Sequence, residues 1–449
     1  NGGVEYGVFE CSPCGFKYPV IAGIPIMVAP HETLDTMAET DATVLLPGPS
    51  GRQLVELVEA KQTTQAFASL LNPSKLDGDL FFPLRGERSE PTSRSARGRV
   101  ERVRQRAQRA FAERLLPRAR LRLAEFLSRH AASLSALGAM DLYYRRFSGV
   151  ENFNYFAYRF GQPRHLAGLA LASRLDGRDG PVLDIACGVG HMAHYFAERR
   201  PDRVTFGLDR DFFRLWVANR YVAPRAHFVC APADRALPFA ASTFDGIFCS
   251  DAFHYFLHRA HSVRELRRLL TREGMIVLAR FGNARVAPRE GYELDVAAYG
   301  ALFADMPHAF IGEERLVQAY LQKRAPDLRR SETAAELESQ KWLSIVASHS
   351  PTALSDGEAF EDWPHAVGRL ALNPIYRETA RSSATELDLE FRFPSHWYEF
   401  ENAGYLNYAP QKGRISRAAL ERANHADGRA AVEQYVSEFL MLGMPDLYS

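Results

Sequence analysis

The sequence predicts an α/β protein with a doubly wound parallel sheet, and three observations support this fold class. Short apolar stretches alternate with helical stretches from residue 141 onward, at the spacing of βαβ units. Hydrophobic residues make up 46% and charged residues 24% of the chain, which is ordinary for a soluble globular protein. The apolar stretch in "VLDIACGVGH" (182–191) runs through a glycine-containing turn into a helix, as strand ends that bind ligands do.

The expected elements follow one another in a regular order. Because crossovers between parallel strands are right-handed, the loops at their carboxyl ends open on one edge, where ligands bind. We expect strands at 181–188, 204–209, 226–231, 244–251 and 274–281, with helices at 191–200, 211–221 and 262–270 between them. Looser helical patterns follow at 293–306, 313–325 and 332–340, then a buried strand at 341–348 that would close the sheet, a strand at 386–395 and a helix at 428–443.

Changes in composition divide the chain into four expected domains. A length of 449 residues suits two to four domains. The expected parts are a small β module at 1–30, a helical and linker region rich in arginine at 31–140, the ligand-binding domain at 141–350 and an accessory α+β domain at 351–449.

Charge and hydropathy narrow the expected partners. Lys and Arg total 55 against 54 Asp and Glu, a net charge of +1, so the whole chain is not built for a polyelectrolyte such as nucleic acid. No apolar run approaches the roughly 20 residues of a membrane span. No signal peptide is visible, and we expect a cytoplasmic protein, although a targeting segment ahead of Asn1 stays open because the chain does not start with Met. A homo-oligomer is compatible with the sequence.

The glycine turn at 186–190 is compatible with two ligand classes. A phosphate-binding Walker loop is excluded because no lysine follows Gly190. A dinucleotide fingerprint would use Gly188, Gly190 and Ala193, and S-adenosylmethionine would use the same small residues with Asp184 before them. Asp209, about 20 residues beyond the glycines at the end of the next expected strand, would accept hydrogen bonds from the ribose hydroxyls of either ligand.

The order of four motifs resembles the class I S-adenosylmethionine-dependent methyltransferases, whose sheet is Rossmann-like. The motifs are "LDIACGVG", "GLD", "LPF…STFD" and "SDAFHY", within roughly 143–281. This chain departs from the family in having Ala186 where glycine is usual, and in reading "PADRALPF" where the family has "G-D-A-x-x-L-P-F". The resemblance implies S-adenosylmethionine as the cofactor.

The resemblance also implies a set of site residues. Arg159 would pair with the methionine carboxylate of the cofactor, and the aromatic segment that contains Tyr144 and Tyr155 would fold over it. His254 and Tyr255 are the candidate catalytic residues, His254 because it would face the transferred methyl group. The cofactor-binding candidates are Asp184, Ala186, Cys187, Gly188, Gly190, Asp209, Arg210, Ala233, Asp234, Ser250 and Arg159.

Two cysteines at the start of the chain form a separate motif. "FECSPCGFKYPVIAGIPIMV" (9–28) resembles the second half of a zinc-ribbon-like domain that partners or precedes methyltransferases. Cys11 and Cys14 would be half of a tetrahedral zinc site whose other pair would lie upstream of Asn1. With a single C-x-x-C pair we expect no metal in the chain itself. The remaining three cysteines, in or next to expected buried strands, suit reduced thiols.

The sequence predicts a methyltransferase that acts on a small molecule, of secondary-metabolite or sugar type. Two alternatives remain open: an RNA methyltransferase, and a non-catalytic scaffold that binds S-adenosylmethionine. Arginines crowd the range 94–129, but few aromatic residues accompany them, so a solvated helix face is favoured over a nucleic-acid surface.

Overall fold

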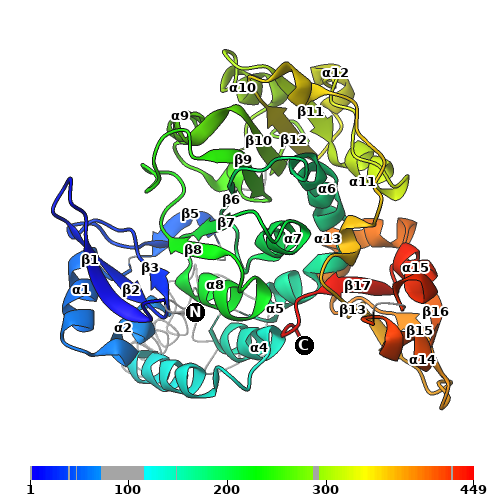
Figure 1. The fold of residues 1–449 in the computed structure, drawn as a ribbon, viewed down its shortest axis with the longest axis horizontal. Coiled ribbons are helices and arrows are strands. Elements are labelled where there is room, and N and C mark those ends of the chain that lie inside the picture. The colour runs from blue at the N-terminus through cyan, green and yellow to red at the C-terminus, as the bar shows by residue number, and fades with distance from the viewer. Residues whose placement is uncertain are drawn as a thin grey trace, which may run out of the picture. The chain divides into compact units, whose positions relative to one another are not determined.

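The computed structural model describes residues 3–38, 41–46, 48–71, 116–147, 149–286, 293–425 and 428–449. The chain packs into two compact units, Asn1–Phe153 and Asn154–Ser449 (Figure 1). The second unit holds both the α/β sheet and the range 351–449, which was expected as a separate domain. The four domain boundaries expected from the sequence therefore stay a prediction.

The first unit combines small antiparallel sheets with helices. Strands β1, β2 and β3 pair in order, so the C-x-x-C pair sits on the turn between β1 and β2. Ser50 caps α1 by accepting a hydrogen bond from the backbone N–H of Gln53, which starts the helix there. The elements are β1 (Tyr6–Glu10), β2 (Lys17–Ile21), β3 (Ile24–Pro25), β4 (Thr36–Ala38), β5 (Asp41–Leu46), α1 (Gly51–Glu59), α2 (Thr63–Leu70), a helical stretch at 116–130, α4 (Ala136–Phe147) and α5 (Val150–Ala157), which continues into the second unit.

A seven-stranded sheet organises the second unit, with strand order β11-β12-β10-β9-β6-β7-β8. All four residues of β6 are buried, as expected for a strand covered on both faces. Strand β12 runs antiparallel to both β10 and β11, so the sheet is mixed, with the expected parallel βαβ units at its centre. The strands are β6 (Val182–Ile185), β7 (Thr205–Asp209), β8 (His227–Cys230), β9 (Phe244–Ser250), β10 (Leu270–Gly282), β11 (His308–Gly312) and β12 (Trp342–Ala347).

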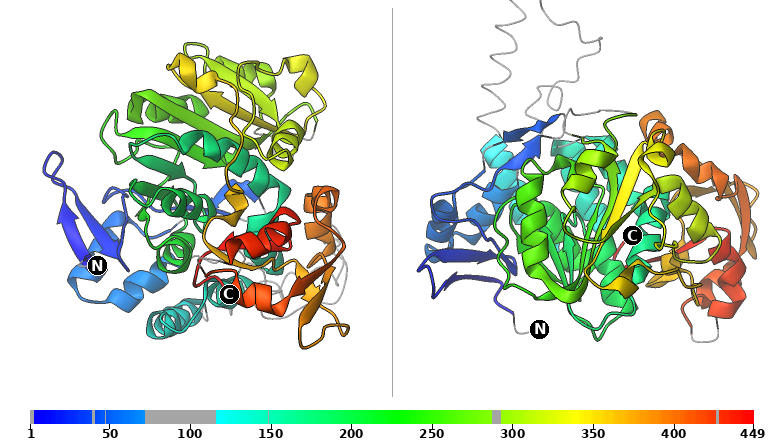
Figure 2. Two further views of the ribbon diagram at one scale, coloured as in Figure 1. Left: turned by 45° about the vertical axis from the view of Figure 1, so that its right-hand side comes forward. Right: turned by 90° about the horizontal axis from the view of Figure 1, so that it is seen from above.

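Helices lie on both faces of this sheet (Figure 2). Several begin at side-chain caps that the sequence supplies: Asp211 caps α8, Asp295 caps α10, and Thr333 forms a capping box with Glu336 at α12. Within the described residues, no helix is both long and apolar enough to cross a membrane. The helices are α6 (Pro163–Ala172), α7 (His191–Arg199), α8 (Phe212–Val217) with a π-turn at Ala218–Val222, α9 (Arg259–Leu269), α10 (Val296–Ala301), α11 (Glu313–Leu321) and α12 (Ala334–Leu337).

The C-terminal part of the second unit contacts the segment that precedes α6. The Tyr448 hydroxyl donates to the backbone carbonyl of Phe156 at 2.9 Å, and the Tyr408 hydroxyl to that of Gly161 at 2.7 Å. These bonds tie the last residues of the chain to the segment that precedes the sheet. The elements are β13 (Arg369–Leu372), β14 (Tyr376–Glu378), β15 (Glu386–Phe391), α13 (His396–Asn402), the 3₁₀-turn η8 (Ala403–Asn407), β16 (Lys412–Ser416), α14 (Arg417–Arg422), α15 (Arg429–Ser437) and β17 (Met441–Met444).

Two elements differ from the sequence prediction for tertiary reasons. The predicted helix at 428–443 ends at Ser437, and its last residues form β17, because they pair antiparallel with β13, about 70 residues earlier in the chain. Strand β11, between two expected helices, was not predicted, and it pairs antiparallel with the distant β12. The strand predicted at 341–348 is β12, which pairs with β10 as expected.

Four buried histidines give the second unit an acid-sensitive core. Burial lowers the pKa of His194 and His365 to about 4, and lowers the pKa of His165 and His191 well below the ordinary value. Their rings pack with Phe160, Trp363 and Phe439, and His365 also bonds the Tyr320 hydroxyl. The folded state therefore holds these side chains neutral at neutral pH.

We predict that stability falls as the pH drops from 6.5 toward 4. In this window the unfolded chain binds protons at these histidines while the folded chain does not, so the unfolding free energy falls by about 1.4 kcal/mol per pH unit for each histidine. Urea denaturation of His365→Gln should show a slope with pH that is smaller by about one proton, whereas the exposed His227→Gln should keep the wild-type slope. Equal slopes in the two variants would contradict the prediction.

Candidate active site

The turn that leaves β6 has a backbone shaped for close approach. Ala186, Gly188 and Gly190 have φ of +56°, +56° and +82°, all in the left-handed region. A Cβ on Gly190 would lie 2.9 Å from the Ala218 Cβ, and a Cβ on Gly188 would lie 3.3 Å from the ring of Phe156. Ala186 shows that the family's usual glycine can be replaced here, at the cost of a strained backbone. The turn thus presents backbone, with few side chains, at the carboxyl edge of the sheet.

Two acids flank this turn. Asp184 lies within β6 with a residue exposure of 2%, and its Oδ2 has no hydrogen-bond partner. Burial raises its pKa well above the ordinary value, and the neighbouring Asp209 adds to this. Asp209 closes β7 and accepts hydrogen bonds from the backbone N–H of Gly188 at 2.9 Å and of Asp211 at 2.8 Å. The structure therefore brings the Asp209 carboxylate directly onto the glycine turn.

Two further residues predicted to bind the cofactor, Arg210 and Asp234, contact each other near the ends of β7 and β8. Arg210 donates to the Asp234 carboxylate at 2.8 Å, and both side chains are largely buried. Ala233 precedes Asp234 and is buried as well. Cys187, the remaining turn residue, donates its backbone N–H to the Leu208 carbonyl at 3.1 Å, which joins the turn to β7.

The end of α5 covers the glycine turn. The ring of Phe156 lies where a side chain on Gly188 would begin, and the guanidinium of Arg214 lies 5.1 Å from the centre of that ring. Sequence reasoning chose Tyr155 and Tyr144 in this segment and missed Phe156. Tyr155 points instead to Asp251, while Tyr144 lies buried in the first unit and is described with that unit alone.

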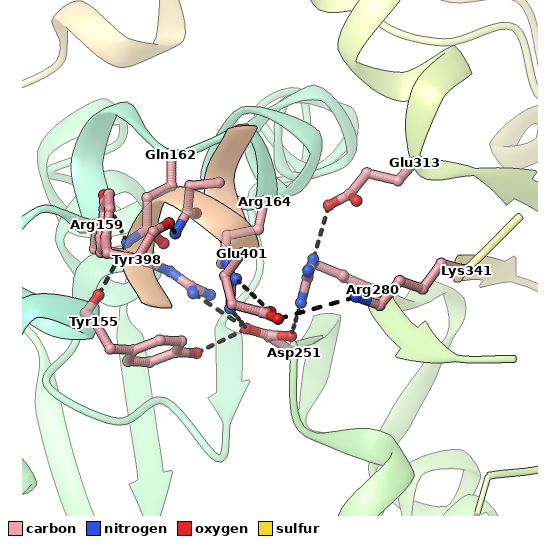
Figure 3. A network of polar contacts seen from close by, with 11 residues as sticks. Tyr155, Arg159, Gln162, Arg164, Asp251, Arg280, Glu313, Lys341, Tyr398 and Glu401 are labelled. Carbon is pink, nitrogen blue, oxygen red and sulfur yellow. Dashed lines mark hydrogen bonds and ion pairs between the residues drawn. The ribbon is translucent and has the colours of Figure 1, made fainter. Parts of the chain in front are cut away.

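A buried carboxylate at the end of β9 forms ion pairs with three arginines. Asp251 follows Ser250, the last residue of β9, and accepts from Arg159 at 3.2 Å, from Arg164 at 3.1 Å and from Arg280 (Figure 3). The Tyr155 hydroxyl donates to the same carboxylate at 2.7 Å. These partners come from four elements: α5, the 3₁₀-turn Arg159–Gly161, α6 and β10. We call these five residues the Asp251 cluster.

Charge balance explains the ionisation of the Asp251 cluster. Burial would raise the pKa of Asp251, but Arg280, Arg164 and Arg159 outweigh it and hold this pKa well below the ordinary value. Asp251 is therefore an anion near neutral pH, and its oxygens are engaged by the three guanidiniums and the Tyr155 hydroxyl. Asp251 and Arg280 also have positive φ, +59° and +55°, so the backbone is strained at both ends of this contact.

The two predicted catalytic residues lie in the same loop, in the 3₁₀-turn Phe253–Tyr255. The His254 ring is buried, its Nδ1 has no hydrogen-bond partner, and its centre lies 4.0 Å from that of Tyr255 and 5.9 Å from that of Trp342. Burial lowers the pKa of His254 to about 4, against the opposing effect of Asp251. His254 is thus neutral at pH 7, with its Nδ1 unpartnered.

Some residues of this edge were missed by sequence reasoning although the sequence carries a signal for them. Arg280 is a charge inside the apolar stretch "GMIVLARFG", and Asp251 is an acid at a strand end. Arg164 and Glu401 carry no such signal, because only the packing of α13 on α6 brings them together. No group of three or more potential metal ligands occurs among the residues that the structure describes, and the arginine-rich range 94–129 lies mostly outside them.

Cys11 and Cys14 lie on an exposed turn of the first unit. The Cys14 thiol is exposed, and hydrogen bonds from the Phe16 backbone and from Cys11 lower its pKa. The backbone N–H of Cys11 donates to the Phe16 carbonyl at 2.9 Å, which holds the turn closed. The zinc-ribbon resemblance of this module stays a prediction.

Comparison with known proteins identifies the α/β region. Residues 183–278 match a family described as "Methyltransferase domain". This chain carries a class I S-adenosylmethionine-dependent methyltransferase domain. The predicted fold class, with its Rossmann-like sheet, is confirmed, and S-adenosylmethionine is the cofactor of this domain.

Curated relatives resemble only this part of the chain. The demethylmenaquinone methyltransferase of Thermotoga maritima is 33% identical over 97 residues, 22% of this chain and 42% of that protein. The ubiquinone/menaquinone biosynthesis C-methyltransferase UbiE of Geotalea daltonii is 29% identical over 113 residues, 24% of this chain and 48% of that protein. The chain therefore spans less than half the length of each of these relatives. Among solved structures, the YcgJ protein of Bacillus subtilis aligns with a TM-score of 0.30 and 19% identity, over 41% of this chain and 99% of that one.

The methyltransferase domain fits its cofactor on two observations of the structure. The left-handed turn at Ala186, Gly188 and Gly190 presents backbone with little side chain, and it follows Asp184, whose buried Oδ2 has no hydrogen-bond partner. The carboxylate of Asp209 closes the next strand at the same edge, where a ribose can be bound by a carboxylate. The residues present therefore suit a ligand that combines a cationic amino-acid end with a ribose.

We predict that Asp251→Asn destabilises the second unit by about 3–5 kcal/mol, because it removes the carboxylate shared by three buried arginines. Asp388→Asn is the matched control: its carboxylate pairs with Arg414, which is 62% exposed, and its loss should cost about 1 kcal/mol at most. Urea denaturation of both variants measures the difference. Equal stabilities would show that the Asp251 cluster contributes little.

Proposed function

We propose that the whole chain transfers a methyl group from S-adenosylmethionine to a small organic acceptor. The observation that carries this proposal is the joint arrangement of the left-handed turn and the Asp209 carboxylate inside the matched methyltransferase domain. The curated relatives are named for quinone methylation, which supports a small molecule as the acceptor class. No observation of the described residues favours RNA over a small molecule.

Each cofactor residue has a proposed task that follows from its position. Asp209 would bind the ribose hydroxyls, and the backbone of 186–190 with Asp184 would bind the amino-acid end. Arg210, Ala233 and Asp234 would surround the adenine, since they lie at the ends of β7 and β8. Arg159 would bind the methionine carboxylate, for which it exchanges part of its contact with Asp251. Ser250 and Cys187 would line the same edge.

The bound cofactor supplies an electrophilic methyl group on a positively charged sulfur. The protein then lowers the barrier mainly by holding the acceptor in line with that methyl group and by excluding water. His254 would take the proton that the acceptor loses, because its neutral ring offers an unpartnered nitrogen at pH 7. Tyr255, whose ring packs on His254, would fix the orientation of the imidazole.

The test of the proposed function begins with the full chain. S-adenosylhomocysteine should bind in a calorimetric titration, and incubation with S-adenosylmethionine and a library of small hydroxylated, aminated and quinol acceptors should release S-adenosylhomocysteine. Total RNA serves as the alternative acceptor in the same assay. Turnover with RNA alone would replace the proposed acceptor class, and binding without turnover on any acceptor would favour a scaffold.

We predict that Asp209→Ala weakens S-adenosylhomocysteine binding by about 30- to 150-fold. The substitution removes charge-assisted hydrogen bonds to the ribose, on the order of 2–3 kcal/mol. Asp202→Ala, at an exposed carboxylate of the preceding turn, should leave the affinity unchanged. An affinity within twofold of wild type in Asp209→Ala would remove Asp209 from the ribose site.

We predict that His254→Ala lowers kcat by about 100-fold or more while the affinity for S-adenosylhomocysteine stays within twofold. Because the pKa of His254 is about 4, the wild-type rate should stay level between pH 8 and 5.5 instead of halving near 6.5. The exposed His258→Ala is the control. A wild-type kcat in His254→Ala would show that another group, or water, accepts the proton.

A further inference from the structure

The residues proposed to bind the cofactor occupy only part of the carboxyl edge of the sheet. The residues proposed for ribose and adenine lie at β7 and β8, on one side of β6. Strands β9, β10 and β12 lie on the other side, and Trp342 at the start of β12 pairs with Gly282 at the end of β10. In the proposed reaction the acceptor would therefore meet the transferred methyl group over the carboxyl ends of β9 and β10 and the start of β12.

Charged side chains from several elements converge at this part of the edge (Figure 3). Arg280 on β10 bonds Asp251 and the Glu313 carboxylate, at 2.7 Å from the latter, and its guanidinium stacks 3.7 Å from the centre of the Trp342 ring. Arg164 on α6 bonds Asp251 and faces Glu401 on α13. An apolar acceptor would find few matching partners on such a surface.

Arg164 is the member of this group with unused hydrogen-bonding capacity. Its side chain is 5% exposed, and Nη1 donates to Asp251 at 3.1 Å. Nε and Nη2 are buried and have no hydrogen-bond partner. Buried guanidinium donors are normally satisfied, and the fork of Nε and Nη2 matches a carboxylate or a phosphate. The free edge of Arg164 is thus shaped for a planar or tetrahedral anion.

A carboxylate of the protein already lies near that free edge without binding it closely. Glu401 Oε2 lies 3.5 Å from Arg164 Nη2, and its Oε1 lies 4.0 Å from Lys341 Nζ. Both separations exceed the usual length of a charge-assisted hydrogen bond. The Glu401 side chain is 2% exposed, whereas that of Lys341 is 35% exposed, so the group meets solvent at Lys341.

We propose that Arg164 binds an anionic group of the methyl acceptor, a carboxylate or a phosphate. In the absence of the acceptor, the Glu401 carboxylate occupies the position of this anion. The proposal rests on the proposed methyltransferase function, because that function makes this part of the edge the acceptor site. Binding moves the Glu401 carboxylate, together with α13, away from Arg164. Lys341 then faces the anion from the solvent side, and Arg164 determines specificity for acidic acceptors.

The first experiment measures anion binding directly. The full chain, saturated with S-adenosylhomocysteine, is titrated with 4-fluorobenzoate and observed by fluorine NMR, with neutral 4-fluorobenzamide as the matched control. We expect the carboxylate to bind and the amide not to bind. Competition with inorganic phosphate assigns the anion: displacement at a lower concentration than that of benzoate points to a phosphorylated acceptor, and failure to displace points to a carboxylate.

Two substitutions should act in opposite directions. Arg164→Met should weaken 4-fluorobenzoate binding at least tenfold, and Arg164→Lys should restore only part of it, because lysine lacks the fork. Glu401→Gln should tighten binding severalfold, because the competing carboxylate is gone. Arg414→Met, at an exposed arginine, is the control and should bind like wild type.

The tightening in Glu401→Gln is the decisive readout, because loss of a merely structural ion pair would not improve binding. Unchanged or weaker binding in Glu401→Gln overturns the proposal, as does wild-type binding in folded Arg164→Met or Arg164→Lys. Affinity for S-adenosylhomocysteine, measured on the same samples, distinguishes failure of this inference from failure of the proposed function. Normal cofactor binding with no anion binding rejects this inference alone, whereas absent cofactor binding rejects the proposed function.

Discussion

The second unit depends on one carboxylate. Asp251 neutralises the guanidiniums of Arg159 and Arg164, from a 3₁₀-turn and the helix that follows it, and of Arg280, from a strand far along the chain. Buried guanidiniums are unfavourable without a closely paired anion, so each of these elements must reach the end of β9. The same requirement fixes where α6 and the segment before it lie against the sheet edge. The positive φ of Asp251 and of Arg280 indicates that the backbone accepts strain to make this contact.

The carboxyl edge of the sheet divides into two halves with different chemistry. The half at β6, β7 and β8 offers a turn with little side chain and carboxylates that can bind a ribose. The half at β9, β10 and β12 offers arginines, glutamates and a neutral histidine. Arg159 connects the halves, since it contacts Asp251 and is the proposed partner of the cofactor carboxylate. In the proposed function, binding of the cofactor carboxylate by Arg159 would therefore change the charge that the other half faces.

Residues 351–449 contribute to the sheet edge through tertiary contacts with α6 and the segment before it. Within this range, the segment 393–410 is rich in aromatic residues. Tyr398 is fully buried, accepts a hydrogen bond from Gln162 at 3.0 Å and donates to the Tyr158 carbonyl. The next turn places Glu401 beside Arg164, while Trp397 and Phe400 stay exposed on the outer side of α13. This short helix thus joins the polar edge of the sheet to the surface of the protein.

The sequence by itself determined the α/β order, the glycine turn and the acids Asp184 and Asp209, because period, turn chemistry and strand ends are local properties. Even Arg280 could be recognised as a charge within an apolar strand. Tertiary structure alone decided that β12 runs antiparallel, that residues 441–444 form a strand, and that Arg164 meets both Asp251 and Glu401. Each of these depends on a partner that is distant in sequence. Pairing between strands, and pairing of buried charges, is fixed by which surfaces the packed chain brings together, and no local pattern records it.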